Sequence, residues 1–138
     1  MSLIEKQKAI VDEFNFFEDW MQKYEYIIEL GKELPKIKEE NKIDLNLIEG
    51  CQSRVWLKSN FENERMFFFA DSDAIITKGI ISLLIQVLNE EKPIDIVKTD
   101  LFFISEIGLQ EHLSPTRANG LLSMVNRMKQ DALKYINT

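Results

Sequence analysis

The sequence predicts an α+β fold, a single domain over residues 1–138 in which helices pack on a small, mostly antiparallel sheet of about three strands. Three observations predict it. Apolar residues recur at helical spacing near both ends of the chain. Between them lies a stretch rich in Val, Trp and Phe that is typical of a β-hairpin. No internal repeat, low-complexity tract or linker divides the 138 residues, which are enough for one core.

The first third of the chain has the pattern of two helices. Apolar residues over 3–17 and over 20–34 follow a spacing near 3.6 residues. Asn15 marks a break between the two helices, and Gly31 and Pro35 end the second one. We expect the aromatic residues of this region in the core and not around a cofactor.

A charged connector over residues 36–42 leads to the predicted sheet. Residues 53–61 and 65–70 form the expected strands, and residues 62–64 form the turn between them. Because a two-stranded sheet is only marginally stable alone, we expect a third strand over residues 44–48.

The next helix is predicted after residues 71–73, whose acidic and hydroxyl side chains are candidates for its N-cap. Its apolar stripe runs to Val87 and ends before Pro93, where a short helical turn begins. Gly79 within the stripe indicates close packing against the sheet.

Two more helices complete the prediction. One follows Asp100 and is interrupted by Gly108. The last has the clearest start, with Ser114 as N-cap and Pro115 at the first helical position. Its expected buried face consists of Leu121, Leu122, Val125, Met128, Leu133 and Ile136.

Composition and charge argue against several classes of function. The net charge of −6 argues against nucleic-acid binding, which needs a basic face, and fits a protein that meets other proteins. The longest apolar run, residues 79–88, is interrupted and far shorter than the ~20 residues of a membrane span. No charged-then-apolar leader opens the chain, so we expect a cytoplasmic protein without a membrane partner.

The counts of cysteine and histidine limit the possible cofactors. Cys51 is the only cysteine, so it cannot form an internal disulfide or an all-cysteine zinc or iron–sulfur site. A mixed site around His112 would need carboxylates from scattered positions, and no ligand spacing indicates one. We therefore expect no metal and no cofactor of the protein's own.

Cys51 is the first candidate for chemistry. A free cysteine is often a small buried hydrophobe, but Gly50 before it and polar Gln52 and Ser53 after it indicate a bend. An ordinary thiol has a pKa of ~8.5 and is mostly protonated at neutral pH. A reactive Cys51 therefore needs cationic or hydrogen-bonding help, or a partner that supplies it.

Arg117 is the second candidate, because it falls at the third position of the last helix. There the helix dipole disfavours a cation, and a glutamate would complete a capping box with Ser114. Arg117 is either a surface charge of little cost or an arginine that meets an anionic sulfur or a partner carboxylate.

Three other polar residues have simpler interpretations. His112 could serve Cys51 as a general base, but no Asn or Asp stands out to orient it, and a loop histidine is the favoured interpretation. Asp71 and Asp73 could form a pair of carboxylates, but helix capping accounts for both.

Three blocks of the sequence resemble the SufE family of sulfur-acceptor proteins, which includes CsdE. They occur in the family's order and at about its spacing. The blocks are Gly50-Cys51-Gln52-Ser53-Arg54-Val55-Trp56-Leu57, Asp71-Ser72-Asp73-Ala74 followed by Lys78-Gly79, and His112-Leu113-Ser114-Pro115-Thr116-Arg117 with Gly120-Leu121.

The resemblance implies that Cys51 accepts sulfur from the persulfide of a pyridoxal-phosphate-dependent cysteine desulfurase, usually SufS. The protein would stimulate the desulfurase and pass the sulfur to an iron–sulfur scaffold, while the pyridoxal phosphate stays with the desulfurase. The family's cysteine loop can tuck its thiol against apolar residues and swing out when the partner docks. Residues that would support the loop or contact the desulfurase are Gly50, Gln52, Ser53, Asp73 and Arg117.

The family's fold is similar to that of IscU-type scaffolds. Glu49 departs from the pattern of many relatives, and its carboxylate would raise the pKa of the nearby thiol. Two alternatives to the sulfur carrier remain. One is a non-catalytic adaptor with a structural cysteine, and the other is a hydrolase that uses Cys51 and His112.

Overall fold

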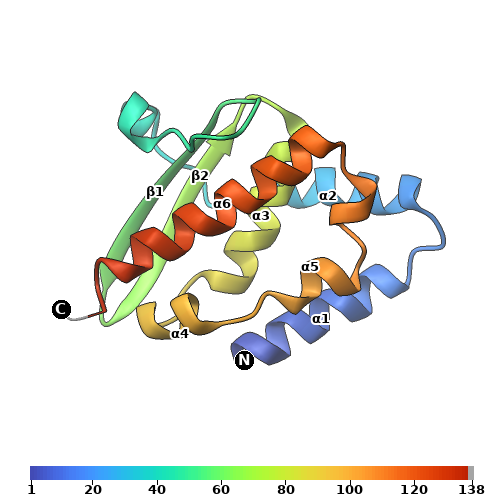
Figure 1. The fold of residues 1–138 in the computed structure, drawn as a ribbon, viewed down its shortest axis with the longest axis horizontal. Coiled ribbons are helices and arrows are strands. Elements are labelled where there is room, and N and C mark those ends of the chain that lie inside the picture. The colour runs from blue at the N-terminus through green and yellow to red at the C-terminus, as the bar shows by residue number, and fades with distance from the viewer. Residues whose placement is uncertain (137–138) are drawn as a thin grey trace.

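A computed structural model describes residues 1–136 and shows an α+β fold (Figure 1). A long two-stranded hairpin forms one side of the molecule, and α3 (Ile75–Leu88) and α6 (Pro115–Leu133) run along it. The helices α1 (Leu3–Asn15) and α2 (Trp20–Gly31) lie on the other side. The fold class predicted from the sequence is confirmed.

The two N-terminal helices form where the periodicity predicts them. The Ser2 hydroxyl accepts a hydrogen bond from the Glu5 N–H, and the Glu5 carboxylate accepts one from the Ser2 N–H, which completes a capping box. The Asp19 carboxylate caps α2 by accepting from the Gln22 N–H at 3.0 Å. Phe14, at 1% exposure, belongs to the core as expected.

The hairpin consists of β1 (Val55–Glu62) and β2 (Arg65–Ser72), paired antiparallel along their whole length. Asn63 and Glu64 form the turn, with positive φ angles of 51° and 66°. Positive φ at both central residues is the geometry of a two-residue type I′ turn, whose twist matches that of the strands. The turn thus forms although it lacks glycine.

The expected third strand over residues 44–48 does not form. Asp44–Asn46 is a 3₁₀ turn, and the segment meets the sheet only at one bridge between Leu47 and Trp56. Asp and Asn favour turns, and Leu45 is 80% exposed, so the alternating leucines of the segment are not buried against a sheet. The hairpin is stabilised by α3, which packs on β2.

The second half of the chain is helical, as predicted. Between α3 and α6 lie two short helices, α4 (Pro93–Lys98) and α5 (Phe102–Glu106). Gly108 follows α5 with a positive φ of 70°, so the interruption predicted there is confirmed.

Two details of α3 differ from the prediction. Its N-cap is Ala74, which makes no side-chain cap, so Asp71 and Asp73 have other partners. A Cβ on Gly79 would overlap the backbone carbonyl oxygen of Ile27 in α2. The glycine is therefore needed for the approach of α3 to α2 and not to the sheet.

The last helix begins as predicted, because the Ser114 hydroxyl accepts from the Arg117 N–H and Pro115 is the first helical residue. Leu122 and Leu133 are 48% and 59% exposed, so their assignment to the buried face was wrong. The helix turn places them on the outer side. The fully buried positions of the stripe are Leu121, Met124, Met128 and Ala132.

Across residues 1–136, none of the helices combines the length and apolar character needed to cross a membrane.

Candidate functional site

Cys51 lies on a short loop, residues 49–53, that leaves the hairpin at the start of β1. The Ile48 N–H donates to the Val55 carbonyl at 2.9 Å and closes the base of this loop. Gly50 has a φ of +93°, a conformation that side-chain-bearing residues rarely adopt. The bend predicted at Gly50 and Cys51 is therefore present, and we call residues 49–53 the cysteine loop.

The thiol of Cys51 rests against helix α6. Its Sγ atom lies 3.6 Å from the carbonyl oxygen of Gly120, at the limit of a weak S–H···O hydrogen bond. Gly120 is buried, and a Cβ at that position would lie 3.5 Å from Sγ, an ordinary van der Waals contact, so the thiol packs directly on this turn of α6. Cys51 is half-buried in this position.

Burial raises the pKa of the Cys51 thiol, because the charged thiolate loses hydration there. The sequence suggested that the carboxylate of Glu49 would have this effect, but burial is the cause in the structure. The resting thiol is consequently protonated and weakly nucleophilic at neutral pH.

A small cavity of about 70 Å³ opens beside Cys51. The structure brings four of the predicted site residues to this cavity, namely Cys51, Gln52, Ser53 and Arg117. The remaining lining residues were not predicted as site residues, although Thr116 and Gly120 belong to one of the quoted sequence blocks; they are Thr77, Ile80, Thr116, Gly120 and Met124. The cavity thus has buried apolar residues on one side and an exposed arginine on the other.

Asp73 does not line this cavity and has a different place in the site. Its carboxylate accepts from the Arg54 N–H at 3.0 Å, and its own N–H donates to the Arg54 carbonyl at 3.3 Å. The Ser72 hydroxyl donates to the same carbonyl at 2.8 Å. These bonds fix the chain directly after the cysteine loop.

Asp71 is a buried carboxylate bound by three lysines and caps no helix. Lys42 lies 2.7 Å from it, Lys78 3.2 Å and Lys36 3.8 Å. Asp71 joins the connector before the sheet to β2 and α3, which is a structural role.

His112 is not part of the Cys51 site. Its ring stacks on Trp20 with centroids 4.0 Å apart, and its Nδ1 lies 2.9 Å from the Gly108 carbonyl oxygen. It does not line the cavity, and no hydrogen bond joins it to Cys51 within residues 1–136. The hydrolase alternative therefore has no support from the geometry.

In the described part of the chain, no three His, Cys, Asp or Glu side chains gather as a metal site would require.

Comparisons with known proteins show the family to which this chain belongs. A family model for SufE, described as an Fe–S metabolism associated domain, matches residues 8–132. An uncharacterized SufE-like protein of Rhizobium etli is 42% identical over 128 residues, which cover 89% of this chain and 86% of the relative. Another from Rhizobium meliloti is 38% identical over 89% of this chain and 91% of the relative. A third, from Synechocystis, is 37% identical over 91% of this chain and 79% of the relative.

A solved structure shares the fold. The solution structure of a hypothetical protein from Thermus thermophilus aligns with a TM-score of 0.79 over 96% of this chain and 97% of that one. Its sequence is 19% identical, so this likeness concerns the fold alone. Because the family model matches most of the chain and the relatives are similar over most of their length, the chain belongs to the SufE family of proteins associated with iron–sulfur metabolism.

Proposed function

We propose that this protein carries sulfur from the persulfide of a SufS-like, pyridoxal-phosphate-dependent cysteine desulfurase to iron–sulfur scaffold proteins. Cys51 is the acceptor, and removal of the persulfide stimulates the desulfurase. The observation that carries the proposal is the position of the only cysteine in a chain of the SufE family. Its thiol lies at a small cavity that it shares with Arg117.

The transfer step is a thiol–persulfide exchange. The Cys51 thiolate attacks the outer sulfur of the desulfurase persulfide, a new S–S bond forms at Cys51, and the S–S bond of the desulfurase breaks. The desulfurase cysteine leaves as a thiolate and takes up the proton that Cys51 has lost. The step needs no external oxidant or reductant, and Cys51 ends as the persulfide.

Binding of the desulfurase activates Cys51. The resting thiol has a raised pKa and contacts the Gly120 carbonyl, so it reacts slowly with electrophiles and oxidants in solution. Movement of the cysteine loop on docking exposes the thiol and relieves the burial that raises its pKa. Gly50 gives the loop the backbone conformation for this, and the bonds of Asp73 to Arg54 hold the far end in place.

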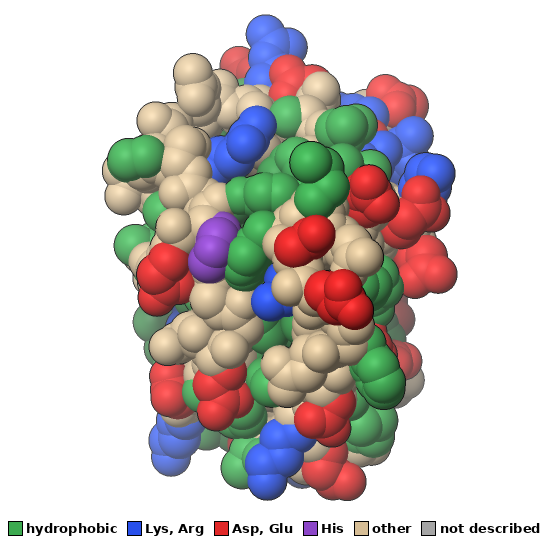
Figure 2. Space-filling model, turned by 90° about the vertical axis from the view of Figure 1, so that its right-hand side faces the viewer, with side chains coloured by type: hydrophobic (Ala, Val, Ile, Leu, Met, Phe, Trp, Pro, Cys, Tyr) green, Lys and Arg blue, Asp and Glu red, His purple; other side chains and the backbone are tan. Residues whose placement is uncertain are grey.

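The face of the molecule on which α2 and α6 begin also suits a protein partner. Phe16, the C-cap of α1, and Met21, in the first turn of α2, are 85% and 70% exposed. Figure 2 shows the side of the molecule on which α2 and α6 begin, and there hydrophobic side chains gather next to acidic ones. Such a surface fits a protein with apolar and basic groups, and not nucleic acid or an anionic membrane. We place the reaction in the cytoplasm, where a free thiol stays reduced.

Mass spectrometry tests the proposal directly. The protein is incubated with its cognate desulfurase and cysteine, and the intact mass is measured without reductant. We expect a gain of roughly 32 Da, the mass of one sulfur atom, which is lost again on reduction. Because Cys51 is the only cysteine, the adduct needs no further assignment.

Cys51→Ser is the matched control, since it replaces the sulfur atom with oxygen and leaves the rest of the site unchanged. We expect it to bind the desulfurase but to gain no sulfur and to give no stimulation. If Cys51→Ser stimulates the desulfurase as well as the wild type does, and the wild type gains no sulfur, the adaptor is the correct function and the carrier is not.

A further inference from the structure

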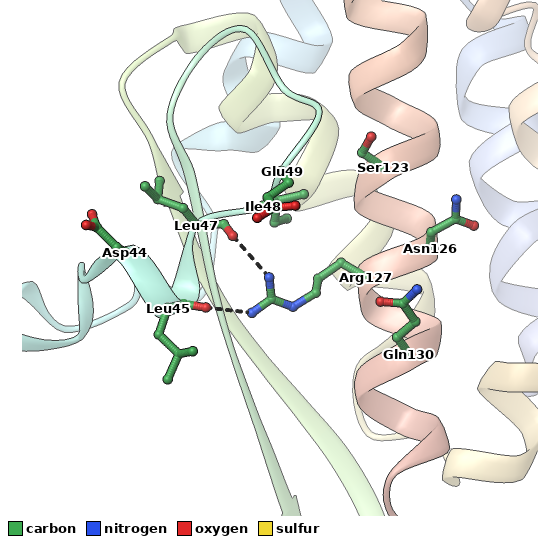
Figure 3. Close-up of a pocket in the computed structure, with 9 residues that line it drawn as sticks. All are labelled: Asp44, Leu45, Leu47, Ile48, Glu49, Ser123, Asn126, Arg127 and Gln130. Atoms are coloured by element: carbon green, nitrogen blue, oxygen red, sulfur yellow. Dashed lines mark hydrogen bonds between the residues drawn. The ribbon is translucent and has the colours of Figure 1, made fainter.

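Arg127 makes an unusual set of contacts close to the cysteine loop. From α6, its guanidinium donates to the Leu47 carbonyl at 3.0 Å and to the Leu45 carbonyl at 3.1 Å. Figure 3 shows both bonds reaching from the helix to the segment before the loop. A guanidinium presents several donors in one plane, so it can hold two carbonyl groups of the same backbone at once.

Open space separates part of the segment that Arg127 holds from α6. A cavity of about 360 Å³ lies between them, with Glu49 and Ser123 in its wall, and another of about 230 Å³ lies on the other side of Arg127. Figure 3 shows the arginine crossing this gap. The Leu45 side chain is 80% exposed and does not anchor the segment. The guanidinium therefore bridges a space that side-chain packing leaves open.

The arginine is itself held in position. Its Nε atom donates to the Asp131 carboxylate at 3.3 Å, and the other oxygen of that carboxylate accepts from the Ser59 hydroxyl at 2.7 Å. Asp131 is only 7% exposed. A buried carboxylate that binds both β1 and Arg127 restricts the directions in which the guanidinium can point.

The same face of α6 also contacts the cysteine loop. Gly120, Ser123 and Arg127 are three and four residues apart and lie on one side of the helix. Gly120 meets the thiol of Cys51, and a Cβ on Gly50 would overlap the Ser123 hydroxyl. Within residues 1–136, no hydrogen bond of ordinary geometry reaches the backbone of residues 49–53. The loop is therefore held by its base, by the packing of Cys51 on the core and by this face of α6.

We infer that Arg127 is a positioning residue for Cys51. By fixing the carbonyls of Leu45 and Leu47 to α6, it sets the place from which the cysteine loop leaves and keeps the thiol seated beside Gly120. Motion of the loop is then confined to residues 49–53. Any effect of Arg127 on the rate of sulfur transfer rests on the proposed function. Its effect on the position and reactivity of the Cys51 thiol does not.

Alkylation of Cys51 by iodoacetamide, measured over a range of pH without any desulfurase, tests this role. In Arg127→Gln we expect the rate at neutral pH to rise about tenfold, since the loss of a charge-assisted hydrogen bond changes an opening equilibrium by about that factor. The pH profile should move to lower pH, because a thiol that leaves its buried position ionises more easily. Hydrogen exchange should increase over residues 44–53 but not in the hairpin.

Lys134→Gln is the matched control. Lys134 also pairs with Asp131, at 3.7 Å, but its side chain is 70% exposed and it does not hold the segment. This variant should keep the wild-type alkylation rate and exchange pattern. If Arg127→Gln fails to fold, Arg127→Lys replaces it, since lysine keeps the charge but cannot bridge both carbonyls. A folded Arg127 variant with the wild-type rate and pH profile overturns the inference, whatever the sulfur-transfer assay gives.

Discussion

At Cys51, protection and reactivity are opposed in a single residue. The contact with Gly120 shields the sulfur, and the same burial raises the pKa of the thiol and lowers its nucleophilicity. A sulfur carrier benefits from shielding while it holds a persulfide. It must overcome the low nucleophilicity of the buried thiol when it accepts one. Both needs are met if the thiol changes place between the resting and the docked protein.

Under the proposed function, Arg117 would show the same opposition between stability and function. It occupies the third position of α6, where its N–H already donates to the Ser114 hydroxyl. In Arg117→Glu, the new carboxylate completes the capping box and suits the helix dipole, so we expect the free energy of unfolding to rise by about 0.5–1 kcal/mol. Urea denaturation measures this change.

The same substitution should slow sulfur transfer. A carboxylate at the Cys51 cavity repels an anionic sulfur, so we expect the rate of persulfide acceptance to fall roughly tenfold. Lys134→Glu makes the same change of charge at the other end of α6 and should leave the rate near the wild-type value. An Arg117→Glu protein that accepts sulfur at the normal rate would show that the arginine has no part in the transfer.

Among the elements, α2 and α3 have a close contact that Gly79 makes possible. In an exposed helix, replacement of glycine by alanine stabilises by about 1 kcal/mol. Here the added methyl group would overlap the Ile27 carbonyl, and the overpacking outweighs that gain. We expect Gly79→Ala to lower the free energy of unfolding by about 2–3 kcal/mol, measured by urea denaturation.

Gln86→Ala is a suitable comparison, because Gln86 lies in the same helix with an exposed side chain. Its unfolding free energy should stay within about 0.5 kcal/mol of the wild type. Equal stability of Gly79→Ala and the wild type would mean that α2 and α3 can separate at little cost.

For the whole molecule, the ion cluster at Asp71 links segments that are distant in the sequence. Burial alone raises the pKa of Asp71, but hydrogen bonds from Lys42, the Ser72 N–H and Lys78 outweigh it, and the pKa lies below its ordinary value. The ionised form is therefore stabilised in the folded protein. This contribution is present above the unfolded pKa of about 3.9 and is lost as the pH falls through the folded pKa.

Asp71→Asn should therefore destabilise the protein by roughly 3 kcal/mol at neutral pH, as expected when a buried ion pair loses one partner. The difference from the wild type should shrink as the pH falls from about 4, the unfolded pKa, toward the lowered folded pKa, where the wild-type carboxylate becomes protonated as well. Unfolding free energies at several pH values measure it. The exposed Asp12 provides the control, since Asp12→Asn should leave the profile unchanged.

Local sequence was sufficient for the helices, the hairpin and the bend at the cysteine. Capping residues such as Ser114 act on amides within one turn, and helical periodicity is a property of neighbouring residues. Gly50 likewise predicts a bend before Cys51, because a positive φ is a local property of glycine. The sequence also singled out Cys51 and Arg117, because a lone thiol and a cation at a helix start are unusual without reference to any distant residue.

Only the tertiary structure decided what those residues meet. The prediction of a third strand was wrong because strand formation depends on continuous pairing and a buried face, whereas residues 44–46 form a 3₁₀ turn and the segment makes a single bridge to β1. Asp71 binds three lysines, two from the connector before the sheet and one from α3, and Gly79 meets α2, contacts that no local pattern contains. The sequence alone determined the elements of this protein and its candidate thiol. The position of that thiol against α6 depends on a contact between residues about seventy positions apart, which only folding brings together.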